Sequence, residues 1–433
     1  MDENFQARLR RLGVTKGARN LKSAPPKPPP AERPLPAAPV DPYEEGFDPP
    51  QPIDTLIPGI RREETAEGAC YILDKVYPLA YRHGQDTLRD LLDLSPAETA
   101  VFTHDPRLAD LDFRDFLFLD TETTGLAGAG TLAFMVGVAF FETGPSGDVF
   151  VVRQYFLRDH GDEPAMLLLL DELLSAKAGL ITFNGRSFDV PLLDTRYLMN
   201  RMPTDLRQKP HIDLLPPSRR LWRQRLESCA LGSLEQSLLG LRRTQEDVPG
   251  WLIPTLYTNY LRSGDARELR RVFYHNQIDM VSMVTLTSRV VRQFARPEVT
   301  DHPIDLYSLG RWQAALGQPD AAEQTLRWAL AGELSLDLYH RTLHELGGLL
   351  KKHGRRAEAV PCWQQIAATT YDDISAHVEL AMHYEWQEGD VETAVRWTEQ
   401  ALALCQSWSP ARAQLVRPEL EHRLARLKGK LEK

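Results

Sequence analysis

Residues 116–126 read Phe-Leu-Phe-Leu-Asp-Thr-Glu-Thr-Thr-Gly-Leu, an apolar run that ends abruptly in two carboxylates. Side chains at positions i and i+2 of a strand point to the same face, so Asp120 and Glu122 are aimed at one spot. Two carboxylates side by side in a buried position repel each other and are costly to desolvate. A divalent cation relieves both costs, because Mg²⁺ prefers oxygen ligands and keeps sites for water and substrate phosphates. The stretch therefore indicates a metal site at the end of a buried strand.

Two further segments strengthen this interpretation, because an Asp-x-Glu pair alone is also typical of a capped turn or of solvated acids. Residues 180–189 read Leu-Ile-Thr-Phe-Asn-Gly-Arg-Ser-Phe-Asp, which predicts a strand, a turn and the start of a helix at Asp189. Residues 274–279 read Tyr-His-Asn-Gln-Ile-Asp and open an apolar-periodic stretch, which predicts a helix. The i,i+4 spacing places His275 and Asp279 on one face of that helix.

Together these segments resemble the DEDD superfamily of 3′–5′ exonucleases, which have a ribonuclease-H-like fold. Asp120 and Glu122 match its first motif, Asp189 matches the second and Asp279 the last, in the same order and with similar separations. The resemblance spans roughly residues 112–293. It implies an α/β domain with a mixed sheet flanked by helices, in which the four acids hold two divalent ions, Mg²⁺ or Mn²⁺.

Within that superfamily the sequence resembles in particular the bacterial YprB-type ribonuclease-H-like branch. Three short segments typical of the branch recur here, at Asp213-Leu214-Leu215, at Cys229-Ala230-Leu231 and from His275 to Asp279. Asp213 is also acidic and follows a predicted strand, but it ranks below the four main acids as a metal ligand.

The general base is the point at which this sequence departs from the superfamily. One branch has a histidine five residues before the last acid, and the other has a tyrosine four residues before it. Here His275 stands four residues before Asp279 and Tyr274 stands five before it, so the identities are exchanged. Four residues along a helix amount to a rotation of about 40° and five to about 140°, which favours His275. An approach of the histidine from a loop would remove this preference. We predict His275 as the base, with Tyr274 packed beside it.

The chemistry implied by the resemblance is the hydrolysis of a phosphodiester. Two metals about 3.5–4 Å apart can activate water and stabilise the leaving oxygen. A neutral histidine with a pKa near 6.5 can take up the proton of the water at physiological pH. We expect substrate contacts from residues beside the acidic motifs: Thr123, Gly125 and Leu126, where a terminal nucleotide can approach, Asn184, which orders the second motif or contacts substrate, and Phe188, which packs nearby.

Composition restricts the class of protein further. A chain of 433 residues is long enough for two or three domains. Its four cysteines are scattered and form no Cys-x-x-Cys pair, which argues against a zinc ribbon or a disulfide framework and suits a reducing cytoplasm. No apolar stretch reaches about 18 residues, so no membrane span is expected. The first residues lack the pattern of a signal peptide.

The net charge of −9 counts mildly against nucleic-acid binding through the overall field. Local charge differs, because eight basic residues gather around Asp213: Arg196, Arg201, Arg207, Lys209, Arg219, Arg220, Arg223 and Arg225. These residues either meet a phosphate backbone or form a solvated helix face. The sequence leaves both interpretations open.

The chain divides into four predicted parts. They are a disordered Pro-rich tail at 1–52, an accessory segment at 53–111, the ribonuclease-H-like domain at 112–297 and a helical domain at 303–433. In the accessory segment a strand is predicted from Thr65 and a short helix over 85–94. In the third part we predict strands at 115–121, 132–142, 148–157, 179–183 and 211–214, and helices at 163–175 and 188–201.

The helical domain contains a weak internal repeat. Gly317, Gly354 and Gly389 recur at intervals of 37 and 35 residues, and each is followed five residues later by an alanine. The pattern resembles tetratricopeptide repeats, whose period is 34. The glycine permits a turn and the alanine permits close contact between helices. We predict a separate module of three helix pairs that turn near these glycines.

Two functions remain open at this point. The first is a metal-dependent nuclease, specifically a 3′–5′ exonuclease that hydrolyses DNA or RNA from a single-stranded 3′ end. The alternative is a catalytically weak or inactive nucleic-acid-binding scaffold that recruits a protein partner through its helical repeats, since fold alone does not establish function. A decayed site usually loses an acid, and this sequence keeps all four, which favours the enzyme.

Overall fold

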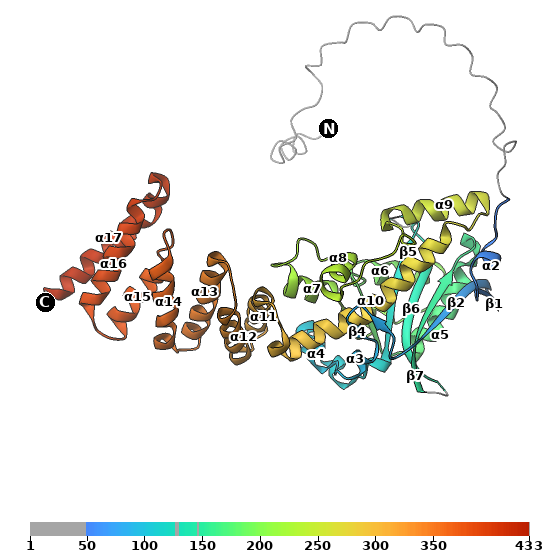
Figure 1. The fold of residues 1–433 in the computed structure, drawn as a ribbon, viewed down its shortest axis with the longest axis horizontal. Helices are drawn as coiled ribbons and strands as arrows, with labels where there is room; N and C mark the ends of the chain where they lie inside the picture. Colours follow the sequence, from blue (N-terminus) through green and yellow to red (C-terminus); the bar gives the residue numbers. More distant parts are fainter. Residues whose placement is uncertain (1–48, 126–129, 145–146, 433) are drawn as a thin grey trace, which may run out of the picture. The chain divides into compact units, whose positions relative to one another are not determined.

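The central feature of the protein is a seven-stranded mixed sheet, seen in a computed structural model that describes residues 49–125, 130–144 and 147–432 (Figure 1). The strand order is β1-β2-β7-β6-β5-β8-β9. β5 is antiparallel to β6 and parallel to β8, and β8 is parallel to β9. The strands are β1 (Arg61–Thr65), β2 (Gly68–Pro78), β5 (Phe116–Thr123), β6 (Ala133–Gly144), β7 (Gly147–Phe156), β8 (Gly179–Thr182) and β9 (His211–Asp213). The predicted mixed sheet is confirmed.

The five strands and two helices predicted for residues 112–297 are all present, with ends shifted by no more than two residues. The helices around the sheet are α4 (Ala97–Thr103), α5 (Glu163–Ala176), α6 (Asp189–Met199), α7 (Leu215–Trp222), α8 (Leu231–Leu234), α9 (Ile253–Ser263) and α10 (Leu269–Ala295). α10 contacts β5, β6 and β7, so it lies across the centre of the sheet (Figure 1). Within the described ranges, no helix combines the length and the apolar character needed to cross a membrane.

β5 is buried because both of its faces are covered. Leu117 and Leu119 join one apolar core, shared with α5 and α6. Phe116 and Phe118 join a second core on the opposite face, shared with α10 and α7. A strand buried on both sides has a nearly continuous apolar sequence, which is why this run identified the centre of the sheet. The same burial desolvates the two acids that follow.

The accessory segment is part of the sheet. The strand expected from Thr65 corresponds to β2, which begins at Gly68 and forms a hairpin with β1. β2 also pairs antiparallel with β7 along eight residues of each strand. The helix predicted over 85–94 is shorter, α3 (Arg89–Leu92), because a small hairpin of β3 (Arg82–His83) and β4 (Asp86–Thr87) occupies the preceding residues. α2 (Ile53–Leu56) buries Ile53 in the core. Most of the predicted tail lies outside the described residues.

The C-terminal region is helical throughout its described length. Its helices are α11 (Pro303–Ala315), α12 (Pro319–Ala331), α13 (Leu336–Lys352), α14 (Arg356–Thr369), α15 (Ser375–Trp386), α16 (Val391–Gln406) and α17 (Pro410–Leu431). Gly317, Gly354 and Gly389 lie between successive helices and have φ values of 77°, 77° and 67°, a left-handed conformation that favours glycine. Each glycine lies in the turn between the two helices of one contacting pair, and the pairs are α11–α12, α13–α14 and α15–α16. The region is therefore repeat-like.

The first of these helices shares a core with the sheet domain. Leu309 and Trp312 of α11 belong to the same apolar cluster as α10 and α7. The Trp312 ring lies 5.1 Å from that of Phe102 and 5.0 Å from that of Phe294, measured between ring centroids. The chain from residue 50 onward is one compact unit. One apolar core therefore spans the boundary, at residues 297–303, that was predicted between the sheet domain and the helical domain.

Trp312→Ala is expected to destabilise the protein by about 3–5 kcal/mol, the usual cost of removing a large buried aromatic side chain. Trp312 is only 6% exposed, so its loss leaves a cavity between the sheet domain and the helical region. The midpoint of urea unfolding, followed by circular dichroism, measures the change. Trp386→Ala is the matched control, because Trp386 is 58% exposed and should change stability little. Equal effects of the two substitutions would contradict a shared core.

Candidate active site

Asp120 lies in a row of residues that crosses three strands. It stands opposite Gly137 on β6, which in turn stands opposite Gln154 on β7. Asn276 of α10 lies over this row. Its Nδ2 donates to Asp120 Oδ2 at 3.1 Å, and its Oδ1 accepts from Gln154 Nε2 at 2.9 Å. A Cβ atom at Gly137 would be 2.1 Å from Asn276 Oδ1, so only glycine leaves room for this contact.

Glu122 and Asp189 are the two most buried acids of the predicted site, with exposures of 9% and 4%. Glu122 is on β5, just before an irregularity in its pairing with β6. Asp189 is the first residue of α6, and its Oδ1 accepts a hydrogen bond of 2.5 Å from Thr121 Oγ1. Since Thr121 alternates with Asp120 and Glu122 along the strand, it holds Asp189 from the other side of β5.

The turn before Asp189 is held by Asp213. Asn184 has a left-handed φ of 68°, as expected for the predicted turn, and its N–H donates to Asp213 Oδ1 at 2.8 Å. The N–H groups of Arg186 and Leu215 donate to the same carboxylate at 3.2 and 3.1 Å. Asp213 therefore accepts bonds from the backbone on both sides of it and orders the turn.

The residues expected to contact substrate differ from one another in exposure and in their contacts. Asn184 is exposed and Phe188 is half-buried beside Asp189. Thr123 Oγ1 donates to the carbonyl oxygen of Gly125 at 2.7 Å, which closes the end of β5. Leu126 lies outside the described residues.

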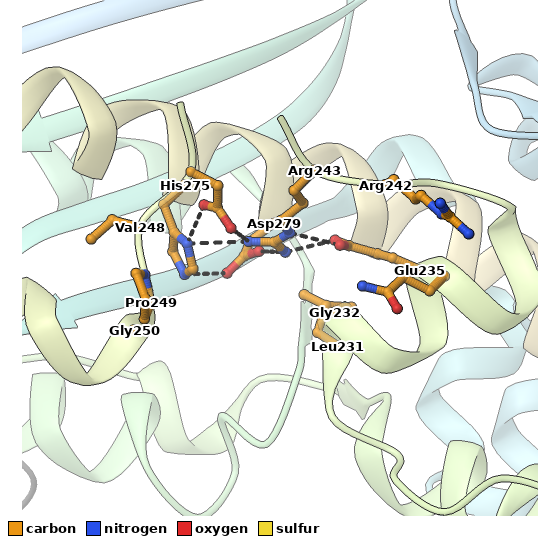
Figure 2. Close-up of a pocket in the computed structure, with 12 residues that line it drawn as sticks. Leu231, Gly232, Glu235, Arg242, Arg243, Val248, Pro249, Gly250, His275 and Asp279 are labelled. Carbon is orange, nitrogen blue, oxygen red and sulfur yellow. Dashed lines mark hydrogen bonds and ion pairs between the residues drawn. The ribbon is translucent and has the colours of Figure 1, made fainter. Parts of the chain in front are cut away.

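His275 and Asp279 lie together on α10, as the helical spacing predicted (Figure 2). His275 Nε2 is 3.5 Å from Asp279 Oδ2, and Nδ1 is 2.7 Å from Asp247 Oδ1. The hydroxyl of Tyr274 instead accepts a bond of 3.2 Å from Thr244 Oγ1, at an exposed position. The structure therefore brings His275, rather than Tyr274, into contact with an acid of the motif.

Arg243 is a member of the site that the sequence did not predict. Its guanidinium donates to Glu235 through two bonds of 2.7 Å and also donates to Asp279 (Figure 2). It is 3.6 Å from Asp247 and 3.2 Å from Nδ1 of His275. These residues line a cavity of about 660 Å³. Arg243 stands in an irregular segment without periodicity, so the sequence carried no signal for it.

Burial and mutual repulsion raise the pKa of each of the four acids predicted from the sequence. Burial raises the pKa of Glu122 to about 7 and that of Asp189 to about 6, and nearby carboxylates add to both effects. Burial and then the charges of Asp189, Glu122 and Asp279 raise the pKa of Asp120 well above its usual range. Burial also raises the pKa of Asp279, although His275 and Arg243 lower it in part. The positive charge of Arg243 therefore compensates only part of the negative charge of these carboxylates.

The charge of His275 follows from the same surroundings. Burial lowers the pKa of its imidazole, but the carboxylates of Asp279 and Glu122 outweigh burial, so the net shift is upward. Histidine and acids thus stabilise each other in their charged forms.

The four acids share one charged neighbourhood, because the charges of Asp189, Glu122 and Asp279 all act on Asp120. In the described ranges, no three side chains of the His, Cys, Asp or Glu type are grouped closely enough to hold a metal ion as they lie. The physical reason is that three of the acids each accept a hydrogen bond from a different side chain. Asn276 donates to Asp120, Thr121 donates to Asp189 and Arg243 donates to Asp279. The donor set itself consists of hard oxygen ligands with excess negative charge, which suits Mg²⁺ or Mn²⁺.

Glu122→Gln is expected to raise the unfolding temperature of the metal-free protein by several degrees at pH 8. The pKa of Glu122 rises from an ordinary 4.5 to about 7 on folding. A carboxyl with a raised folded-state pKa contributes stability that is present below pH 4.5 and is lost as the pH rises through 7. The amide loses nothing over this range, so the difference between variant and parent should grow with pH.

Thermal unfolding in a chelator between about pH 4 and pH 8 measures this difference. Glu142→Gln is the matched control, because Glu142 is exposed on β6 and should give no pH-dependent difference. A difference for Glu122→Gln that stays constant across the range would contradict the raised pKa.

Comparison with known proteins agrees with this geometry. Residues 117–291 match the family described as the RNase_H superfamily, a range that begins in β5 and ends in α10. The chain is also 30% identical over 374 residues to "Uncharacterized protein YprB" of Bacillus subtilis (strain 168). That alignment covers 83% of this chain and 86% of the relative. The family match therefore includes Asp120, Glu122, Asp189 and Asp279 and the strands from β5 to β9.

Proposed function

Because this chain belongs to the same family as YprB of Bacillus subtilis and carries a ribonuclease H-like domain, we propose that it is a metal-dependent nuclease. Specifically, we propose a DEDD-type 3′–5′ exonuclease that removes nucleotides from a single-stranded 3′ end of DNA or RNA. The observation that carries the proposal is the crowding of Asp120, Glu122, Asp189 and Asp279, whose pKa values all rise through burial and proximity. Perturbed pKa values gathered in one place are typical of a functional site, and divalent cations such as Mg²⁺ prefer carboxylate oxygens as ligands.

In this proposal the four acids would hold two Mg²⁺ or Mn²⁺ ions, which would offset phosphate charge and lower the pKa of water. His275 would act as the base through Nε2. A carboxylate only accepts hydrogen bonds, so the Asp247 contact requires a proton on Nδ1, and the neutral form of the ring would carry its lone pair on Nε2. As the water oxygen bonds to phosphorus, Nε2 would take its proton. The bond from phosphorus to the 3′ oxygen would break, that oxygen would gain a proton, and a nucleoside 5′-monophosphate would leave.

The residues beside the acids would receive the terminal nucleotide. Thr123 and Gly125 shape the end of β5, and Leu126 follows them in the sequence. Asn184 and Phe188 flank the start of α6. We propose that a base or sugar packs against Phe188 and that Asn184 contacts the substrate from its exposed position.

A second candidate function rests on Arg243. Its bond to Asp279 occupies one of the four acids, which favours a nucleic-acid-binding scaffold of low or no activity. In that case the helix pairs of the C-terminal region, which we propose to be tetratricopeptide-like, would recruit a protein partner. For either function we propose a cytoplasmic location, since all four cysteines are free thiols.

Degradation of end-labelled single- and double-stranded DNA and RNA tests the proposal. With Mg²⁺ or Mn²⁺, a 5′-labelled single strand should shorten progressively from its 3′ end, and a chelator should stop the reaction. Release of 5′-mononucleotides, identified by mass spectrometry, separates an exonuclease from an endonuclease. Tight binding of the same strands without cleavage under any metal condition would overturn the nuclease and support the scaffold.

A further inference from the structure

The basic cluster around Asp213 separates into paired and unpaired side chains. Four of its members have acidic partners: Arg196 with Glu163, Arg207 with Asp194, Lys209 with Asp205 and Arg225 with Asp305. The other four are exposed and have no ion-pair partner in the part of the chain that the structure describes: Arg201, which follows α6, and Arg219, Arg220 and Arg223, on α7 and at its C-terminal cap. Three like charges within five residues repel one another, so this arrangement has a cost that an anionic ligand would remove.

Arg219, Arg220 and Arg223 line a groove between α7 and α11. The groove is a cavity of about 690 Å³, and Arg311 of α11 lines it from the opposite side. Arg311 forms an ion pair of 2.7 Å with Glu345, a residue that does not line the cavity. Among the described residues, no carboxylate lines this cavity, although the whole chain has a net charge of −9. The groove is therefore a positively charged surface on an acidic protein.

A second cavity connects the groove to the turn before Asp189. It has a volume of about 370 Å³ and shares Arg220 and Trp312 with the first. Arg186 and Asp213 line its other end. The carboxylate of Asp213 already accepts three backbone N–H groups, so its charge is compensated in part. The two cavities together lead from the loop that carries the second acidic motif to the first helix of the repeat-like region.

The shape of the groove limits what it can bind. Tyr307 and Trp312 form its floor, but they are only 1% and 6% exposed, so their rings are not available for stacking on bases. Contacts would come from the guanidinium groups, which bind phosphate oxygens bidentately. A cavity of this volume is of small-ligand size, which fits a few nucleotides of one strand rather than a duplex.

We propose that the α7–α11 groove, defined by Arg219, Arg220, Arg223 and Arg311, binds the phosphodiester backbone of a single nucleic-acid strand. The strand would continue past Arg186 toward the acidic site, where its end would lie. Because phosphates carry no sequence information, this binding would be independent of sequence and sensitive to salt. The inference rests on the proposed function, since it names the surface that would hold the substrate of the same site.

Binding of a fluorescent single strand of about 20 nucleotides to the full chain, measured by anisotropy in a chelator at several salt concentrations, tests the groove. Each phosphate contact on a single strand contributes about 0.7 to the slope of log K against log salt. The double variant Arg219→Gln/Arg223→Gln should therefore lower the slope by about 1.4 and weaken binding by roughly 10–30-fold at 0.1 M salt. Arg219→Lys/Arg223→Lys should retain most of the slope, because it keeps the charge.

Arg262→Gln/Arg270→Gln is the matched control. Both residues are exposed, on α9 and at the start of α10, and the substitution changes the net charge by the same amount. It should leave the slope within error of the parent. If this control lost as much affinity as Arg219→Gln/Arg223→Gln (the α7 variant), only the overall charge would matter, and the proposal that the groove binds the strand would be overturned.

The outcomes separate this inference from the proposed function. Cleavage by the parent, together with normal binding by the α7 variant, would overturn the groove and leave the nuclease standing. Salt-dependent binding that needs the α7 arginines, without cleavage, would support the groove and overturn the nuclease. Absence of any nucleic-acid binding by the parent would overturn the groove directly.

Discussion

Asp120→Asn is expected to lower the rate of nucleic-acid cleavage by roughly 10³-fold or more. A metal ion contributes several kcal/mol of transition-state stabilisation, and each 1.36 kcal/mol corresponds to a factor of ten in rate. The amide keeps the size of the side chain and still accepts the bond from Asn276 Nδ2 through its oxygen. The substitution therefore removes the negative charge with little change in packing. Initial rates on a 5′-labelled strand in Mn²⁺ measure the loss.

Two further measurements make this result specific. Mn²⁺ should raise the unfolding temperature of the parent, since a ligand that binds only the folded state stabilises it, and should raise that of Asp120→Asn less. Glu142→Gln removes a carboxylate from an exposed position of the same sheet and should keep full activity. If Asp120→Asn cleaved at the parental rate, the acidic cluster would not be the site of the reaction.

His275→Ala is expected to lower the cleavage rate by about 10²–10⁴-fold, the usual contribution of a general base. The imidazole contacts Asp279 on one side and Asp247 on the other, so its removal leaves the four acids in place. The variant should therefore keep the Mn²⁺-induced rise in unfolding temperature while it loses turnover. This combination distinguishes a lost base from a lost metal ligand.

Tyr274→Phe is the matched control for the histidine. Its hydroxyl contacts Thr244 at an exposed position, so removing that oxygen should change the rate by less than a factor of about two to three. The reverse result, with His275→Ala active and Tyr274→Phe inactive, would show that the site works with a tyrosine and that the helical-rotation argument is wrong.

The sequence predicted the sheet domain well because its signals are local. The apolar run before Asp120 identified a strand buried on both faces, and the Asn184-Gly185 turn marked the start of α6. The spacing of His275 and Asp279 is a property of one helix and also appeared without tertiary information. The accessory segment was harder, because the pairing of β2 with β7 joins residues about 80 positions apart.

The remaining features of the site depend on contacts between distant segments. Arg243 meets Asp279 across 36 residues, and its own segment has no periodic pattern. The basic cluster was visible in the sequence, but only the structure shows that Arg225 is paired with Asp305, whereas Arg219 and Arg223 have no ion-pair partner among the described residues. The convergence of the four acids around a common point stays a prediction, since each acid's side-chain conformation depends on the donor beside it.

The bonds that hold the individual acids have a consequence for how the protein is made. Thr121, Asn276 and Arg243 each provide a donor from the chain itself, so a newly synthesised polypeptide can reach its native arrangement before it meets a cation. Under the proposed function, metal loading would then be the last step of maturation and would require Arg243 to release Asp279. The availability of the ion in the cell, rather than folding, would set how much of the protein is active.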